Sequence, residues 1–226
     1  HDENGTYYLD GDDYIDLGQN SLFNFGEDES FSISIWVNST SSNSMIISNY
    51  PGSTEASYYL RFEDGKIKFY VSDGTENSQI VSDIAYNNYV WHHVVAVRDT
   101  INSQLYLYVD GSQVATAVTD TTGSITPSNN LYIGDDPDPV SRFYGGYIDD
   151  LKIFNRSLSA QQISFLYTGK KDKLSYMETE NNNLYSVCVT SNDGISDLTE
   201  VCGTNMSISR PVTANRRYFN YNFGTN

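Results

Sequence analysis

The chain has 226 residues, and its 19 tyrosines and 10 phenylalanines supply enough bulky side chain to fill the space between two packed β-sheets. It carries 13 basic and 29 acidic residues, and the resulting net charge of −16 repels phosphate backbones and anionic lipid surfaces. Composition therefore disfavours a disordered chain, a nucleic-acid-binding protein and a membrane-surface protein. The acidity does not by itself indicate a cation-binding role, because it also keeps an extracellular protein soluble.

The N-terminal residues 1–4 have neither a basic flank nor an apolar stretch, and no apolar run approaches the roughly 20 residues of a membrane-spanning helix. We therefore expect a secreted or cell-surface protein whose signal peptide has been removed. Acceptor sequons for N-glycosylation begin at Asn4, Asn38, Asn155 and Asn205. As a set they favour surface exposure in a glycosylating secretory route.

Alternating apolar and polar residues predict a half-buried strand over residues 31–37. A hairpin follows, because residues 58–62 and 66–71 flank Asp64-Gly65, a pair suited to the positive φ angles of a tight turn. Further strands are predicted at residues 91–98, 104–110, 113–117, 131–134 and 143–154. Such regularly spaced short strands are typical of an all-β sandwich of two antiparallel sheets.

One short helix is predicted to follow Ser159, whose hydroxyl can cap it while Gln162 stands three residues further on. Gly169 would end this helix after about two turns. Lysines at 170, 171 and 173 then mark a polar boundary. We therefore predict a main domain over residues 1–170 and a small C-terminal β extension over residues 171–226.

The extension contains the two cysteines, Cys188 and Cys202, on either side of a turn-rich stretch. This arrangement predicts a disulfide within a β-hairpin or half of an immunoglobulin-like unit. A two-residue turn at Asp193-Gly194 would place Cys188 opposite Thr199, so the disulfide requires a wider turn. A zinc site is disfavoured, because it needs about four ligands and the three histidines are not placed to complete the set.

The last residues of the chain alternate again, with Phe219, Tyr221 and Phe223 on one side of a predicted strand. This strand has no evident partner in its own hairpin. It pairs either with the main sandwich of the same chain, which we favour, or with a neighbouring subunit by strand addition.

Several motifs in this order resemble the laminin G and pentraxin-like group of concanavalin A-type jelly rolls. The residues that carry the resemblance are 9–17 (LDGDDYIDL), 35–37 (IWV), 91–97 (WHHVVAV), 107–111 (LYVDG), 131–134 (LYIG) and 143–159 (FYGGYIDDLKIFNRSLS). The resemblance covers roughly residues 7–169. It implies two curved antiparallel sheets, with ligands taken at a loop rim or on the concave face, often beside calcium.

Asp149 has the same parity in its strand as Leu151 and Ile153, so we expect its carboxylate to be partly buried if those two face the core. Calcium could compensate that charge with oxygen ligands from the loop at residues 10–13. Asp10, Asp12 and Asp149 are therefore the candidate calcium ligands. The alternative is that Asp149 accepts backbone N–H bonds from a neighbouring loop.

Other candidate groups are weaker. The acidic loop at residues 135–138 could converge on a cation or be a solvated loop, and it lacks the spacing of a recognised calcium loop. His92 and His93 open a strand, which favours a structural role. The acidic run at residues 27–29 lacks the alternation that glycosidase carboxylates show along a strand. We therefore predict that the protein is not an enzyme.

Tyr50, Tyr86 and Tyr89 stand in polar segments where they could stack on sugar rings or pack loop edges. We predict a secreted, non-catalytic binding or adhesion module of laminin G-like type, stabilised by calcium, that recognises a glycan or protein at a cell surface. The alternative is a structural subunit of an extracellular filament or surface layer, assembled by strand addition through the chain termini.

Overall fold

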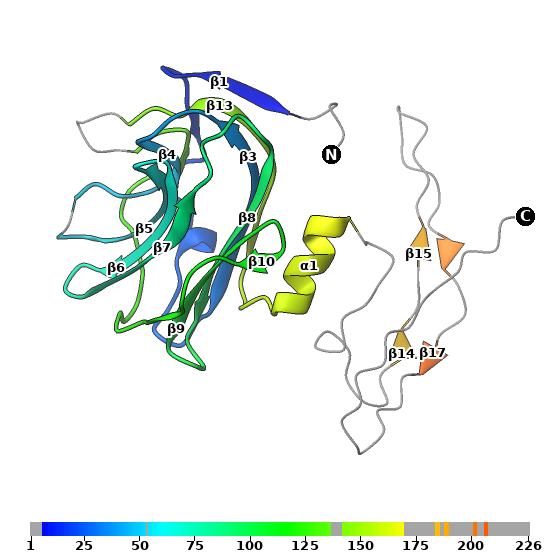
Figure 1. The fold of residues 1–226 in the computed structure, drawn as a ribbon. Coiled ribbons are helices and arrows are strands. Elements are labelled where there is room, and N and C mark those ends of the chain that lie inside the picture. Colours follow the sequence, from blue (N-terminus) through cyan, green and yellow to red (C-terminus); the bar gives the residue numbers. More distant parts are fainter. Residues whose placement is uncertain are drawn as a thin grey trace, which may run out of the picture. The chain divides into compact units, whose positions relative to one another are not determined.

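The computed structural model describes residues 6–52, 54–136 and 142–169, together with four two-residue strands near the C-terminus. The chain divides into two compact units, residues 1–168 and 169–226. The first unit consists of two facing antiparallel sheets and one α-helix (Figure 1). The predicted all-β class, with two antiparallel sheets and a single short helix, is confirmed.

Sheet A is seven-stranded. Its order is β1 (Tyr7–Asp10), β13 (Gly145–Phe154), β3 (Phe31–Ser39), β8 (His92–Asp99), β9 (Gln104–Val109) and β10 (Ser112–Gln113), with β11 (Val118–Thr119) also paired to β9. Neighbouring strands are antiparallel throughout.

Sheet B is six-stranded and stacks against sheet A. Its order is β2 (Ile15–Asp16), β12 (Tyr132–Ile133), β4 (Ser44–Ser48), β5 (Ala56–Glu63), β6 (Lys66–Asp73) and β7 (Asn77–Ala85). A short 3-10 helix, η1 (Ser21–Phe23), lies between β2 and β3.

The core lies between the two sheets and is built by period-2 alternation. Ile33 and Ile35 of β3 are fully buried on the inner face of sheet A, and Leu60 and Phe69 are fully buried on the facing side of sheet B. Burying a side chain of this size stabilises the fold by roughly 1.5–3 kcal/mol. Each strand therefore turns its other residues outward, and those outward residues are what a ligand can meet.

The β5–β6 hairpin forms as predicted. Asp64 and Gly65 both have positive φ, 50° and 76°, which is the backbone of a tight turn whose twist suits two antiparallel strands. The turn fixes the register, with Tyr59 opposite Tyr70 and Arg61 opposite Lys68 on the outer face. Each residue's place on sheet B thus follows from this two-residue turn.

The predicted strand over residues 113–117 is wrong in its bounds. Val114 donates its N–H to the carbonyl of Leu107 in sheet A, while its own carbonyl accepts the N–H of Asp83 in β7 of sheet B. The chain leaves sheet A at this point, so β10 contains only Ser112 and Gln113.

The helix α1 (Ala160–Thr168) begins with the predicted capping box. Ser159 donates its N–H to Oε1 of Gln162 at 2.9 Å, and its hydroxyl accepts the N–H of Gln162 at 3.3 Å. Ile163 is buried and packs with Val95 and Val97 on the outer face of sheet A. The helix therefore covers part of that face, as Figure 1 shows.

In the second unit the structure describes two pairs of short strands. β14 (Leu184–Tyr185) pairs with β17 (Met206–Ser207), and β15 (Cys188–Val189) pairs with β16 (Val201–Cys202). The register places Cys188 directly opposite Cys202, the backbone arrangement that the predicted wider turn requires. The disulfide itself, and the strand predicted from residue 216 onward, lie outside what is described.

Candidate functional site

The acidic loop after β1 gathers three carboxylates. Asp10, Asp12 and Asp13 are exposed, and each offers an oxygen within 4.8 Å of the others. The side chains of Asp10 and Asp12 share a hydrogen bond, which lowers the pKa of Asp10 and raises the pKa of Asp12. The proton of this bond therefore stays on Asp12. Carboxylate oxygens are the ligand type that calcium prefers, and three of them would be completed by backbone carbonyls or water to the six to eight that calcium takes.

Asp149 does not join this group. Asp10 pairs with Gly145 across the β1–β13 ladder, and Asp149 lies four residues further along β13, about 13 Å at the rise of a strand. The register of β13 also shifts between Asp149 and Lys152. Ile148 faces the core before this bulge and Leu151 after it, so Asp149 points to the outer side, opposite Trp36. Asp149 is half-buried, as expected, but it does not share the core-facing side of Leu151 and Ile153.

Asp149 makes a local contact instead: its Oδ1 accepts the N–H of Asp150 at 2.6 Å. That bond comes from the adjacent residue.

The second acidic loop is tied to an arginine. Oδ1 of Asp135 accepts the N–H of Arg142 at 3.0 Å, and Oδ2 of Asp136 accepts the Nε–H of Arg142 at 3.0 Å. Both aspartates are buried. Both carboxylates therefore bind Arg142, and Asp138 lies outside the described residues.

Both histidines are structural. Asp110 and Asn88 hold the ring of His92 by hydrogen bonds of 2.8 and 3.0 Å. His93 is 2% exposed and its Nε2 lies 2.9 Å from the Ser34 hydroxyl. Burial lowers the pKa of His93 to about 4, so the ring is neutral at physiological pH.

The sequons differ in accessibility. Asn155 is exposed just after β13, whereas Asn38 lies inside β3 with 9% of its surface exposed. A glycan has no room at so buried a side chain, so burial argues against occupancy at Asn38. Asn4 and Asn205 lie outside the described residues.

The acidic run at Glu27, Asp28 and Glu29 stays in the loop before β3, where Glu29 accepts the N–H of Gly26.

A cluster of aromatic and basic side chains occupies the outer face of sheet B. We call this set the Tyr–Arg face; its members are Met45, Tyr50, Tyr59, Arg61, Lys68, Tyr70 and Arg142. Tyr59 and Tyr70 stack with ring centroids 4.7 Å apart, and Tyr50 meets both edge-on. Burial raises the pKa of Tyr59 to about 12, so its phenol stays protonated.

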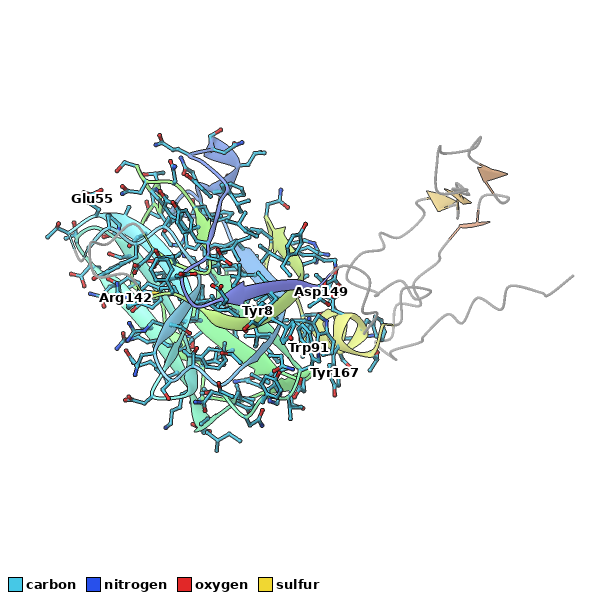
Figure 2. All side chains as sticks on the ribbon, turned by 90° about the horizontal axis from the view of Figure 1, so that it is seen from above. Tyr8, Glu55, Trp91, Arg142, Asp149 and Tyr167 are labelled. Atoms are coloured by element: carbon cyan, nitrogen blue, oxygen red, sulfur yellow. The ribbon has the colours of Figure 1, made fainter. Side chains whose placement is uncertain are left out.

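The basic side chains lie over these rings. The guanidinium carbon of Arg61 is 5.6 Å from the Tyr59 ring centre, and that of Arg142 is 6.0 Å from the Tyr50 ring centre. Arg142 reaches this position because its carbonyl accepts the N–H of Met45 at 2.8 Å. In Figure 2 Arg142 lies on the side of the molecule away from α1.

Two cations face each other across the β5–β6 ladder. Arg61 and Lys68 are directly opposite, an arrangement that is unfavourable between like charges. Burial, and then the charge of Arg61, lower the pKa of Lys68. Glu63 bridges both cations, yet Nε of Arg61 is buried without a hydrogen-bond partner among the described residues. The fold thus concentrates positive charge that a further anion would stabilise.

Of the tyrosines considered from the sequence, Tyr50 belongs to the Tyr–Arg face. Tyr86 packs edge-on against His92, with ring centroids 5.0 Å apart, and Tyr89 is exposed. Sequence reasoning missed Tyr59, Arg61, Lys68 and Tyr70. Their alternation with core residues on either side of Asp64-Gly65 is the signal that could have found them.

The comparison with known families decides the relationship. The profile described as the concanavalin A-like lectin/glucanases superfamily, of laminin G type, matches residues 9–164. The chain belongs to this superfamily. The resemblance inferred from the short motifs is confirmed, and the first unit of this laminin G-like protein accounts for the whole match.

Individual relatives are distant. The chain is 26% identical over 186 residues to a non-toxic nonhemagglutinin type A of Clostridium botulinum, which covers 76% of this laminin G-like chain but only 15% of that relative's length. A sialidase CBM40 of Ruminococcus gnavus bound to α2,3-sialyllactose has the same fold, with a TM-score of 0.61 and 18% identity over 72% of this chain and 96% of the other. Domains LG4-5 of mouse laminin α1 align with a TM-score of 0.55 and 13% identity over 70% and 44% of the two chains.

Within the described residues of this laminin G-like chain, no helix has the length and apolar character to cross a bilayer.

Proposed function

We propose that the first unit is a non-catalytic, extracellular glycan-binding module that takes an acidic sugar on the Tyr–Arg face. The observation that carries this proposal is the pair of opposed cations, Arg61 and Lys68, in a protein of net charge −16. A fold that places like charges opposite each other gives up stability, and Glu63 offsets only one of these two positive charges, so the carboxylate of a ligand can pair with the other. The stacked rings of Tyr59 and Tyr70 beneath them are each 6% exposed, so they support the basic groups and leave the contact with the sugar to those groups.

The overall negative charge does not oppose this assignment at short range. At physiological ionic strength, charges separated by more than about 8 Å are largely screened. A bound carboxylate therefore responds mainly to the basic groups beside it. A solved domain of the same fold is bound to a sialylated sugar, which supports the choice of ligand class.

We further propose that calcium binds at Asp10, Asp12 and Asp13 and stabilises the loop after β1. The three exposed carboxylates within 4.8 Å support this proposal, because their mutual repulsion is relieved by a divalent cation. Asp149 has no part in it, since the β1–β13 register holds it apart from that loop.

Binding to immobilised sialylated and uronic-acid-containing oligosaccharides tests the acidic-sugar proposal. Arg61→Gln or Arg142→Gln should weaken such binding by roughly 10- to 100-fold, the loss expected for one charge-assisted hydrogen bond. Lys152→Gln is the matched control, because it removes the same charge from sheet A. Absence of any acidic glycan ligand, or an equal loss with Lys152→Gln, would refute the proposal.

A further inference from the structure

A second aromatic surface lies on the other layer, beyond the part of sheet A that α1 covers. Tyr8 of β1 and Tyr147 of β13 are paired neighbours with ring centroids 4.8 Å apart, and Trp91 lies 6.3 Å from Tyr147. Tyr8 is 58% exposed and Tyr89 61% exposed. We call Tyr8, Tyr89, Trp91 and Tyr147 the sheet A aromatic surface. Figure 2 shows Tyr8 and Trp91 away from Arg142.

Phenol groups converge on this surface. The rings of Tyr8 and Tyr147 are 4.8 Å apart, and ionisation of the neighbouring Tyr89 phenol would raise the pKa of Tyr147. The surface therefore combines flat rings with several hydroxyls that can both donate and accept hydrogen bonds.

Backbone strain occurs at the same place. Tyr89 has φ of 60°, in the left-handed region, and among the non-glycine residues with positive φ in the described chain it is the only aromatic one. A bulky residue in this conformation costs about 1–2 kcal/mol. The N–H of Tyr89, which donates to the carbonyl of Ser39 at 3.1 Å, helps to hold the conformation and keep the ring on the surface.

An unsatisfied polar atom lies beneath the rings. Asn38 is paired with Tyr147 in the β3–β13 ladder and is 9% exposed, and its Oδ1 is buried without a hydrogen-bond partner among the described residues. Such an acceptor costs about 1–3 kcal/mol. Two separate losses of stability thus occur at one exposed surface, a pattern that indicates a binding function.

From these observations we infer that the sheet A aromatic surface is a second binding site, which takes an uncharged sugar ring stacked on Tyr8 and Tyr147. The composition of the surface selects the ligand class: none of its four residues is charged, so it lacks the cation that an anionic sugar requires. Aromatic faces stack on the C–H side of a pyranose while phenol oxygens bond its hydroxyls. This inference does not depend on the Tyr–Arg face, because the two surfaces belong to different sheets.

The test uses the full chain on an array of uncharged oligosaccharides that end in glucose, galactose, mannose or N-acetylhexosamine. The strongest ligand is then titrated against variants by calorimetry. Tyr8→Ala and Tyr89→Gly should each weaken binding roughly five- to tenfold, the effect of one stacked ring. Tyr7→Ala is a matched control, because Tyr7 is the preceding residue of β1, is 63% exposed and points to the opposite side of the strand.

Tyr89→Gly also separates function from structure. Glycine adopts positive φ freely, so this variant should melt at an unchanged or higher temperature while it loses the ligand. The inference is overturned if no uncharged glycan binds, or if Tyr7→Ala weakens binding as much as Tyr8→Ala. It is also overturned if sedimentation shows that the protein is a dimer and that Tyr8→Ala makes it monomeric, because a second copy would then cover the surface. Unchanged binding by Arg61→Gln distinguishes this site from the Tyr–Arg face.

Discussion

Arg98 offers the sharpest test of how the sandwich is held together. Its side chain is fully buried at the end of β8, and Nε donates to Asp120 at 2.7 Å. The two terminal nitrogens donate to the carbonyls of Thr122 at 2.9 Å, Gly123 at 2.8 Å and Gly26 at 3.1 Å. This single guanidinium therefore fastens two loops to sheet A.

We predict that Arg98→Met lowers the free energy of unfolding by about 3–5 kcal/mol, because it leaves the Asp120 carboxylate buried without its cation. For a unit of this size that loss corresponds to a fall in melting temperature of roughly 6–20 °C. Urea denaturation followed by tryptophan fluorescence measures it.

Arg156→Met is the control, because Arg156 is exposed and its guanidinium lies 5.8 Å from the Phe154 ring, so the same change should cost no more than about 1 kcal/mol. The double variant Arg98→Met/Asp120→Leu should recover part of the loss, since it removes both charges. Equal stability of Arg98→Met and the parent protein would show that the buried pair contributes nothing, and the reasoning would fail.

Three further predictions concern cation binding, pH and modification. Calcium should raise the melting temperature of the metal-free protein, and Asp12→Asn should reduce that rise. The same melting temperature with calcium and with chelator in calorimetry would contradict calcium binding. The pKa of His93 falls from 6.5 to about 4 on folding, so between these pH values only the unfolded chain binds the proton, and the free energy of unfolding should fall as the pH drops. His93→Gln should make the dependence of this free energy on pH less steep, by at most about 1.4 kcal/mol per pH unit, as denaturation at several pH values would show. In a glycosylating host, Asn155→Gln should remove a glycan mass while Asn38→Gln leaves the mass of attached glycan unchanged, as intact-protein mass spectrometry would show.

Local patterns predict this fold well wherever a strand alternates without interruption. The alternation over residues 31–37 matches the buried face of β3, and Asp64-Gly65 fixes the β5–β6 register. The same reasoning fails at Asp149, because a bulge in β13 changes which parity faces the core. A bulge leaves little trace in the apolar pattern, so the register beyond it has to be seen in three dimensions.

The candidate sites depend on contacts between distant segments. Tyr59 and Arg61 can be placed together from alternation alone. Arg142 joins them only because a segment far along the chain lies beside β4, where the carbonyl of Arg142 accepts the N–H of Met45. The salt bridge between Arg98 and Asp120 is likewise absent from any local pattern, as it joins a strand to a loop 22 residues away.

The two-layer architecture has a consequence for how the module would engage its surroundings. The outward sides of stacked sheets point in opposite directions, so a molecule held by sheet A and one held by sheet B do not compete for space. If both proposed sites bind their sugars, one copy of the domain would be bivalent and would link two separate glycan chains. Tethering of this kind multiplies weak individual contacts through effective concentration, without oligomerisation.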